Sequence, residues 1–272
     1  MIETEPHGAW PRTMIHILAS EWLKIRSVRS TYYTLAVVVI GVAGMAVLAW
    51  QASAMWDRLS PVDRQHFGLS PLEPIITQIA ELCLAILGIL AITPEYATGM
   101  IRTSLVAVPQ RRVMLSAKAG IVAAIGLAAG LTSIFATSLA SRAIVGHRPI
   151  RYFMSPGSHQ TSLLLAQGMS VIAFAVVGLS LGVILRSTIG AVVCVVLLLY
   201  VIPMVSQGLP APWDKRVNSV ALDSLAGQIA GSGNANSIYG SLLSPLAALA
   251  VMIAYVVVPL AAAAALIQRR DA

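Results

Sequence analysis

The sequence predicts an all-α integral membrane protein with six transmembrane helices. The chain of 272 residues is 57% hydrophobic and only 11% charged, whereas soluble domains carry about 25% charged residues. Apolar runs of about 18 residues or more recur along it, and a helix of that length crosses a hydrocarbon core of roughly 30 Å. Helices are required because backbone groups in lipid find no water to bond. The alternating pattern of barrel strands is missing from the sequence.

The six expected spans form a single transmembrane domain that covers residues 1–272. An even number of spans places both termini on one side of the membrane. That side would carry eleven of the 18 Lys and Arg residues and the other side seven, a bias that favours cytoplasmic termini and a location in the cell membrane. The expected spans are residues 32–50, 74–93, 117–140, 162–185, 188–207 and 244–267. The eleven are Arg12, Lys24, Arg26, Arg29, Arg102, Arg111, Arg112, Lys118, Arg186, Arg269 and Arg270, and the seven are Arg58, Arg64, Arg142, Arg148, Arg151, Lys215 and Arg216.

The net charge of +7 is better explained by a membrane than by nucleic acid, because the basic residues lie beside apolar runs. Cys83 and Cys194 both lie inside such runs, far from other ligand residues at metal-binding spacing. We interpret them as small core residues rather than as a disulfide, a redox pair or a metal site.

Before the first span, residues 13–30 predict a helix that lies in the membrane interface. The pattern over residues 13–28 is amphipathic, which suits a helix with its apolar face in lipid and Trp22 at headgroup depth. The alternative is an ordinary juxtamembrane stretch. The apolar arc holds Met14, Ile15, Leu18, Trp22, Leu23 and Ile25, and the polar arc holds His16, Ser20, Lys24 and Ser27.

Between the second and third spans, residues 95–109 predict a short rigid helix outside the membrane. Gly99 permits a turn, residues 100–107 can form two helical turns, and Pro109 disfavours α geometry at Val108. Such a helix, parallel to the membrane, offers a contact for a soluble partner. We expect the basic residues that follow it to hold the third span to anionic headgroups; these are Arg111, Arg112 and Lys118.

The chain lacks the sequence patterns of an enzyme. No Gly-Lys pair occurs, so there is no Walker A loop for ATP phosphates. Gly178-Leu-Ser-Leu-Gly182 matches the pattern around a serine nucleophile, but a serine nucleophile needs a base in reach, and every histidine lies before the fourth span, with His147 and His159 in a predicted outer loop. We therefore interpret this glycine pair, like Gly126 and Gly130, as a helix-packing face, and expect no catalytic, cofactor or metal site.

Glu81 is the acidic residue that we place inside a span. An intramembrane carboxylate is costly and often lines a transport pathway. The alternative is that Glu81 lies near the interface and reaches water, and both interpretations remain open from sequence.

Two further features concern the second half of the chain. Pro203 and Pro259 interrupt the last two spans and should bend them. The long polar connection 208–243 is expected on the outer face, where residues 216–230 can form a short surface helix. The sequence assigns no role to this connection.

Two motifs resemble the type-2 ABC export permeases, particularly those of actinobacteria. Ser20-Glu-Trp-Leu-Lys-Ile-Arg-Ser-Val-Arg-Ser30 is similar to the amphipathic elbow that opens that family. Glu95-Tyr-x-Thr-Gly-x-x-Arg102, followed by Pro109 and Arg111, is similar to its cytoplasmic coupling segment. The six-span plan with a long outer connection before the last span is similar as well.

The resemblance implies a permease subunit that pairs with a second permease, the same or homologous. Two separate ATPase subunits would bind ATP and Mg and drive export, since this chain departs from a full transporter by lacking a nucleotide-binding domain. The family's coupling role maps onto Glu95, Tyr96, Gly99, Ile101, Arg102, Leu105 and Pro109. Glu95 and Tyr96, next to the membrane, would fix the helix angle through local hydrogen bonds. The rival is a secondary transporter, or another multi-span protein without an ATPase partner. Sequence does not identify the substrate.

Overall fold

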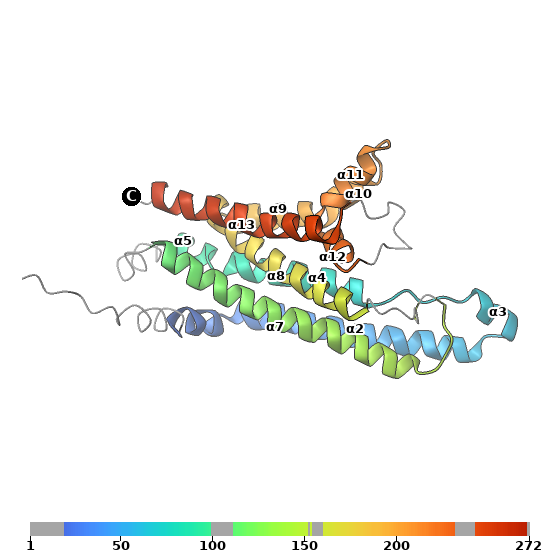
Figure 1. Ribbon diagram of the computed structural model, residues 1–272. Helices are drawn as coiled ribbons and strands as arrows, with labels where there is room; N and C mark the ends of the chain where they lie inside the picture. The colour runs from blue at the N-terminus through green and yellow to red at the C-terminus, as the bar shows by residue number, and fades with distance from the viewer. Residues whose placement is uncertain (1–18, 99–110, 152, 154–159, 232–242, 271–272) are drawn as a thin grey trace, which may run out of the picture.

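The computed structural model describes residues 19–98, 111–151, 153, 160–231 and 243–270. Within these ranges the chain is helical and contains no β-strand beyond an isolated bridge between Gly68 and Arg151. Six helical segments are long and apolar enough to cross a membrane (Figure 1). They are Arg29–Arg58, Glu73–Ala97, Val113–Val145, Gln160–Leu185, Thr188–Ser206 and Pro245–Arg269. The protein is therefore a multi-pass membrane protein, and the predicted six-span architecture is confirmed.

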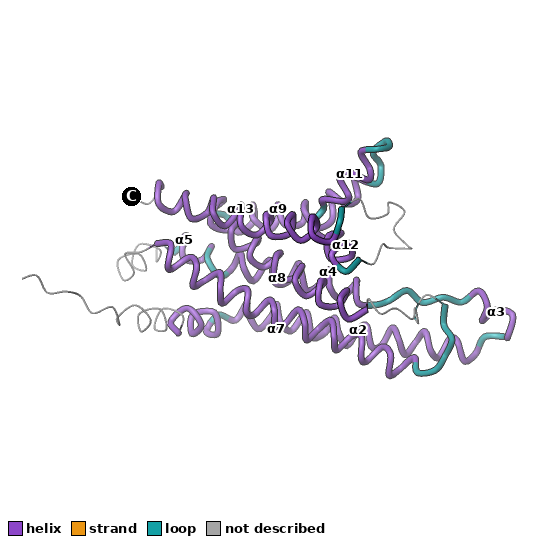
Figure 2. The backbone as a smooth tube through the Cα atoms, in the orientation of Figure 1, coloured by secondary structure: helices purple, strands orange, loops and turns teal. Residues whose placement is uncertain are grey.

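Helices account for most of the described chain (Figure 2). A helix over residues 19–27 precedes α2. The elements that follow are α2 (Arg29–Arg58), α3 (Pro61–His66), α4 (Glu73–Leu90), α5 (Thr93–Ala97), α7 (Arg111–Val145), α8 (Gln160–Leu185), α9 (Thr188–Val196), a π-helical turn (Leu197–Val201), α10 (Ile202–Ser206), α11 (Trp213–Val220), α12 (Leu222–Ile229) and α13 (Pro245–Arg270).

Helices α4 and α8 form the centre of the bundle. In the most apolar 18-residue stretch of each span, 61% of the residues are buried inside the protein for the second span and 72% for α8. The corresponding share is 17% for α2, for the α9–α10 segment and for α13. Because apolar side chains gain nothing by leaving lipid for protein, burial here must come from close packing of surfaces rather than from hydrophobicity. The outer helices turn most of their apolar surface outward, as lipid-facing helices do.

Glycines explain how α4 and α8 approach so closely. A Cβ at Gly88 would collide with the backbone of Ala175 and Leu179, and a Cβ at Gly178 would collide with the backbone of Ala85. Only residues without a side chain permit this contact between backbones. The predicted packing role of Gly178 is thereby confirmed, and the other predicted glycines also face neighbouring elements: Gly126 and Gly130 face α8, and Gly182 faces Ile92.

The fifth span is interrupted where a proline was expected to bend it. Pro203 cannot donate a backbone hydrogen bond, and its ring crowds the carbonyl four residues earlier. The chain accommodates this with the π-helical turn Leu197–Val201 between α9 and α10. Pro259 lies inside α13, which continues through it.

The connection before α13 contains two helices rather than the single helix expected over 216–230. Ala221 adopts an extended conformation between α11 and α12, with φ −64° and ψ 134°. Leu222 and Leu225 of α12 are fully buried in a cluster with residues of α8 and α13. Helix α12 is thus part of the core rather than a surface helix.

The bundle has two distinct ends. Residues 19–27, α5 and the last turn of α13 lie at one end, which we call the network end (Figure 1). Helices α2 and α7 extend together to the other end, which carries α3. There the Arg148 guanidinium donates two hydrogen bonds, of 2.9 and 2.8 Å, to the Asp57 carboxylate.

Candidate functional site

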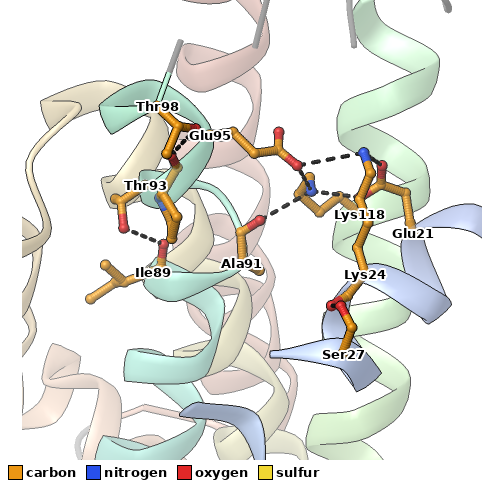
Figure 3. A network of polar contacts seen from close by, with 10 residues as sticks. Glu21, Lys24, Ser27, Ile89, Ala91, Thr93, Glu95, Thr98 and Lys118 are labelled. Carbon is orange, nitrogen blue, oxygen red and sulfur yellow. Dashed lines mark hydrogen bonds and ion pairs between the residues drawn. The ribbon is translucent and has the colours of Figure 1, made fainter. Parts of the chain in front are cut away.

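At the network end, four charged side chains from three separate elements form a connected ion network (Figure 3). Lys118 of α7 donates to Glu21 of the 19–27 helix at 2.5 Å and to Glu95 of α5 at 2.9 Å. Lys24 donates to the other oxygen of Glu21 at 2.6 Å and lies 3.6 Å from Glu95. The network therefore joins the helix that precedes the first span to the end of the second span and the start of the third.

A break in the second span creates part of this site. Helix α4 ends at Leu90, Ile92 leaves helical geometry at φ −127° and ψ −38°, and Pro94 helps α5 to start, as proline does in a first helical turn. A helix end leaves carbonyl groups without intrahelical partners. The Lys118 ammonium donates to one of them, the carbonyl of Ala91, at 3.0 Å.

Burial makes the charges of the network energetically costly unless each is paired. The side chains of Lys118, Glu21 and Glu95 are 1%, 3% and 9% exposed, whereas Lys24 is 39% exposed. Taking such charges out of water costs several kcal/mol each, and only good geometry and further hydrogen bonds offset that cost. Lys118 meets this condition because its three N–H groups have three acceptors.

The network favours the charged forms of Glu21 and Lys24. Burial alone would raise the pKa of Glu21, but the Lys118 and Lys24 ammonium groups outweigh it and hold that pKa below the ordinary value of 4.5. Burial likewise opposes the charge of Lys24, but Glu21 and Glu95 raise its pKa above 10.5. The lowered pKa of Glu21 and the raised pKa of Lys24 keep this pair charged around neutral pH.

The sequence matches no known family model, and it matches no curated protein. The function must therefore be argued from the residues and their geometry.

Of the predicted coupling residues, the structure describes Glu95 and Tyr96. The others, Gly99, Ile101, Arg102, Leu105 and Pro109, lie outside the described residues. The side-chain partners of Glu95 are Lys118 and Lys24, far away in sequence, rather than the local groups expected from sequence. The Tyr96 ring lies under the Arg186 guanidinium, 5.0 Å from its centroid. Both side chains therefore hold α5 to other elements.

One expectation about the third span is wrong. Lys118 does not reach anionic headgroups, because its side chain is 1% exposed and its ammonium group is bound by Glu21, Glu95 and the Ala91 carbonyl. The physical reason is position: Lys118 lies seven residues after Arg111, the first residue of α7, and therefore deep beside the end of α4. Carboxylates within reach replace headgroups as its partners.

The 19–27 helix also differs from the single apolar arc expected. Trp22 and Leu23 are 48% and 62% exposed, whereas Ile25 is buried in the main core cluster together with residues of α2 and α4. Glu21, one turn before Ile25, is buried on the same side. The helix thus turns one apolar pair outward and anchors itself through Glu21 and Ile25.

Glu81 lies at the contact between the two central helices. Its side chain is buried, and the Ser170 hydroxyl of α8 donates to its Oε1 at 2.5 Å. Its Oε2 has no hydrogen-bond partner among the described residues. In this conformation Glu81 therefore faces protein, not water or lipid, which the interfacial interpretation had not anticipated.

Ser180, the serine of the Gly178–Gly182 pattern, is fully buried. Its hydroxyl donates to the Val176 carbonyl one turn earlier, at 2.8 Å. The side chain is thus held within its own helix, on a different face from the one that Gly178 and Gly182 share.

Sequence reasoning missed Glu21 and Lys118 as members of a site. A signal was present, since a lysine near the start of the third span and a glutamate near the end of the second are charges of opposite sign at the same membrane boundary. The partner on residues 19–27 could not be found this way, because its distance to Lys118 depends on how that helix folds back.

Proposed function

We propose that this protein is the membrane-spanning permease subunit of an ATP-driven ABC exporter of the type-2 class. In this proposal the substrate pathway forms between two permease subunits, identical or homologous, and two separate ATPase subunits bind ATP and Mg. The network end faces the cytoplasm, in keeping with the excess of Arg and Lys on that side.

One observation carries the proposal: the buried ion network braces both flanks of the segment expected to contact the ATPase. Glu95 is the first residue of that segment, 95–109, and Lys118 lies within the first two turns of α7, which follows it. Lys118 binds both Glu95 and Glu21, so it connects Glu95 to the 19–27 helix. A force applied to residues 99–110 would thus be transmitted to the second span, the third span and the 19–27 helix together.

This arrangement suits a coupling device because a buried network of ion pairs resists local bending. Separating Lys118 from its carboxylates in a low-dielectric site costs far more than breaking a pair on the surface. The flanks therefore move as one body with the 19–27 helix.

The test is the physical and functional link to an ATPase. Affinity purification of the full chain from native membranes in mild detergent is expected to recover an ATPase subunit with a Walker A loop. Arg102→Glu should lower its recovery, or leave ATP hydrolysis running without transport, because truncating an interfacial charge typically costs about 2–5 kcal/mol. The matched control is Arg58→Glu, an exposed arginine at the opposite end of the bundle. Purification of the chain without any ATPase, together with transport that ignores ATP, would refute the proposal.

A second candidate is a cation-coupled secondary transporter, and Glu81 favours it. A carboxylate buried between α4 and α8, with one oxygen unpartnered among the described residues, has the properties of an intramembrane ion or proton relay. The two candidates differ in their energy source. Transport that a protonophore abolishes while ATP is held constant would select the second.

A further inference from the structure

A cavity of about 250 Å³ opens beside the ion network, between the 19–27 helix and the second span. Its apolar wall is formed by Ile25, Val28, Leu87, Leu90 and Pro94. Its polar side includes Lys24, Ser30 and the Glu95–Lys118 ion pair, in which the lysine offsets the charge of the carboxylate. The volume is slightly below the lower limit for a pocket that takes a drug-sized molecule, about 300 Å³, and suits one narrow apolar chain with a polar head.

The exposed charge next to this cavity is positive. Within residues 19–30 the sequence contains Lys24, Arg26 and Arg29 and a single carboxylate, Glu21. Glu21 is buried and bound to Lys118, whereas Arg26 and Arg29 are exposed and Lys24 is 39% exposed. Lys24 has two carboxylates beside it among the described residues, Glu21 at 2.6 Å and Glu95 at 3.6 Å, and its ammonium group has a third N–H that can bind a ligand.

The start of α2 adds to this positive field. Val28 and Ser30 line the cavity, and Val28 precedes the first residue of this 30-residue helix without a side-chain cap among the described residues. A helix N-terminus carries a partial positive charge and N–H groups without intrahelical partners, both of which favour an anion; at this one the Thr31 N–H is bonded to the Val28 carbonyl at 3.2 Å. Here it acts beside a lysine and at the mouth of an apolar cavity.

The aromatic residues place this cavity at the depth of lipid headgroups. Trp22, Tyr32 and Tyr33 are 48%, 54% and 68% exposed, and such side chains gather where the hydrocarbon core meets water. The cavity lies between them along the chain, since residues 24–31 contribute six of its thirteen lining residues.

We propose that this cavity binds one anionic phospholipid from the leaflet that contacts the network end. The phosphate lies against Lys24 and the N-terminus of α2, and the upper part of one acyl chain lies along Leu87, Leu90 and Pro94. The lipid thereby fills the gap between the 19–27 helix and the second span, and it strengthens the same connection that the Glu21–Lys118 pair makes. This inference does not depend on the transported substrate or on the energy source.

The experiment measures thermal unfolding of the purified full chain in detergent with phosphatidylglycerol or phosphatidylcholine added. At ten times its dissociation constant, phosphatidylglycerol is expected to raise the midpoint by about 4 °C, and phosphatidylcholine should leave it unchanged. Lys24→Gln should abolish the difference between the two lipids, and Lys215→Gln, an exposed lysine on α11, should retain it. Because each variant is compared with itself in two lipids, a general loss of stability does not affect the result.

A second pair of variants leaves the ion network intact. Ser30→Phe should fill the mouth of the cavity and abolish the lipid difference, and Ser30→Ala should retain it. This pair decides the matter if Lys24→Gln does not fold. Equal shifts with phosphatidylcholine would show an unselective apolar groove, and equal shifts with inorganic phosphate alone would show a site for free anions. Either result, or a lipid difference that survives in Ser30→Phe, would overturn the proposal.

Discussion

Replacing Lys118 by methionine is expected to destabilise the protein by about 3–5 kcal/mol, the cost of removing one partner from a buried ion pair. Methionine has nearly the same shape as lysine and leaves no large cavity. The loss comes instead from Glu21 and Glu95, whose carboxylates would remain buried at 3% and 9% exposure with only Lys24 nearby. The Ala91 carbonyl would also lose its donor.

The assay is thermal unfolding of the detergent-solubilised chain, followed with a thiol-reactive fluorophore that labels Cys83 as it becomes exposed. Cys83 is a free thiol, 8% exposed in the folded protein. A loss of this size corresponds to a fall of about 10 °C in the midpoint. The control is Lys215→Met, which removes an exposed lysine from α11 and should change the midpoint by little.

A double variant separates the electrostatic cause from a loss of packing. Lys118→Met combined with Glu95→Gln leaves Glu21 and Lys24 as a balanced pair, so the combined loss should be clearly smaller than the sum of the two single losses. Additive losses would refute the reasoning, because they would show that Lys118 and Glu95 act independently. So would a Lys118→Met midpoint equal to that of the control.

Three further predictions follow from the same structure. Gly178→Ala should destabilise the chain by about 1–3 kcal/mol through overpacking. Gly120→Ala should not, because nothing lies within 4 Å of the new Cβ. Equal thermal unfolding midpoints in the two variants would contradict the α4–α8 contact. Glu81→Gln should keep the fold, since an amide oxygen can accept the same hydrogen bond, and should lower substrate-stimulated ATP hydrolysis in the assembled complex; unchanged stimulation would leave Glu81 with a packing role alone. Because the pKa of Glu21 is held below 4.5, its contribution to stability is present above that pH and is lost as the pH falls through the lower folded value. The unfolding midpoint, measured from pH 6 down to about pH 3, should therefore fall less steeply with decreasing pH in Glu21→Gln than in Asp63→Asn. The Asp63→Asn control alters an exposed carboxylate on α3. An equal dependence of the midpoint on pH in the two variants would count against the network.

The sequence by itself determined the number and kind of the membrane-spanning elements. Hydrophobic length is a property of a local stretch of chain, and a stretch of about 20 apolar residues must be helical in lipid whatever surrounds it. The glycine pair Gly178 and Gly182 could be identified as a packing face for a similar reason, because close backbone approach requires small residues one turn apart. The sequence did not show that Gly178 meets Ala85.

Only the tertiary structure decided which charges meet. Lys118 and Glu21 are 97 positions apart, and Glu81 and Ser170 are 89 apart. Their contacts depend on how each helix is rotated about its axis and shifted along it, and a rotation of one residue, about 100°, would separate them. Hydrophobicity does not fix that rotation in a membrane, because lipid tails solvate an apolar face as well as protein does. The register is set instead by the packing of small residues and by the cost of leaving a buried charge unpaired, and both depend on all the helices at once.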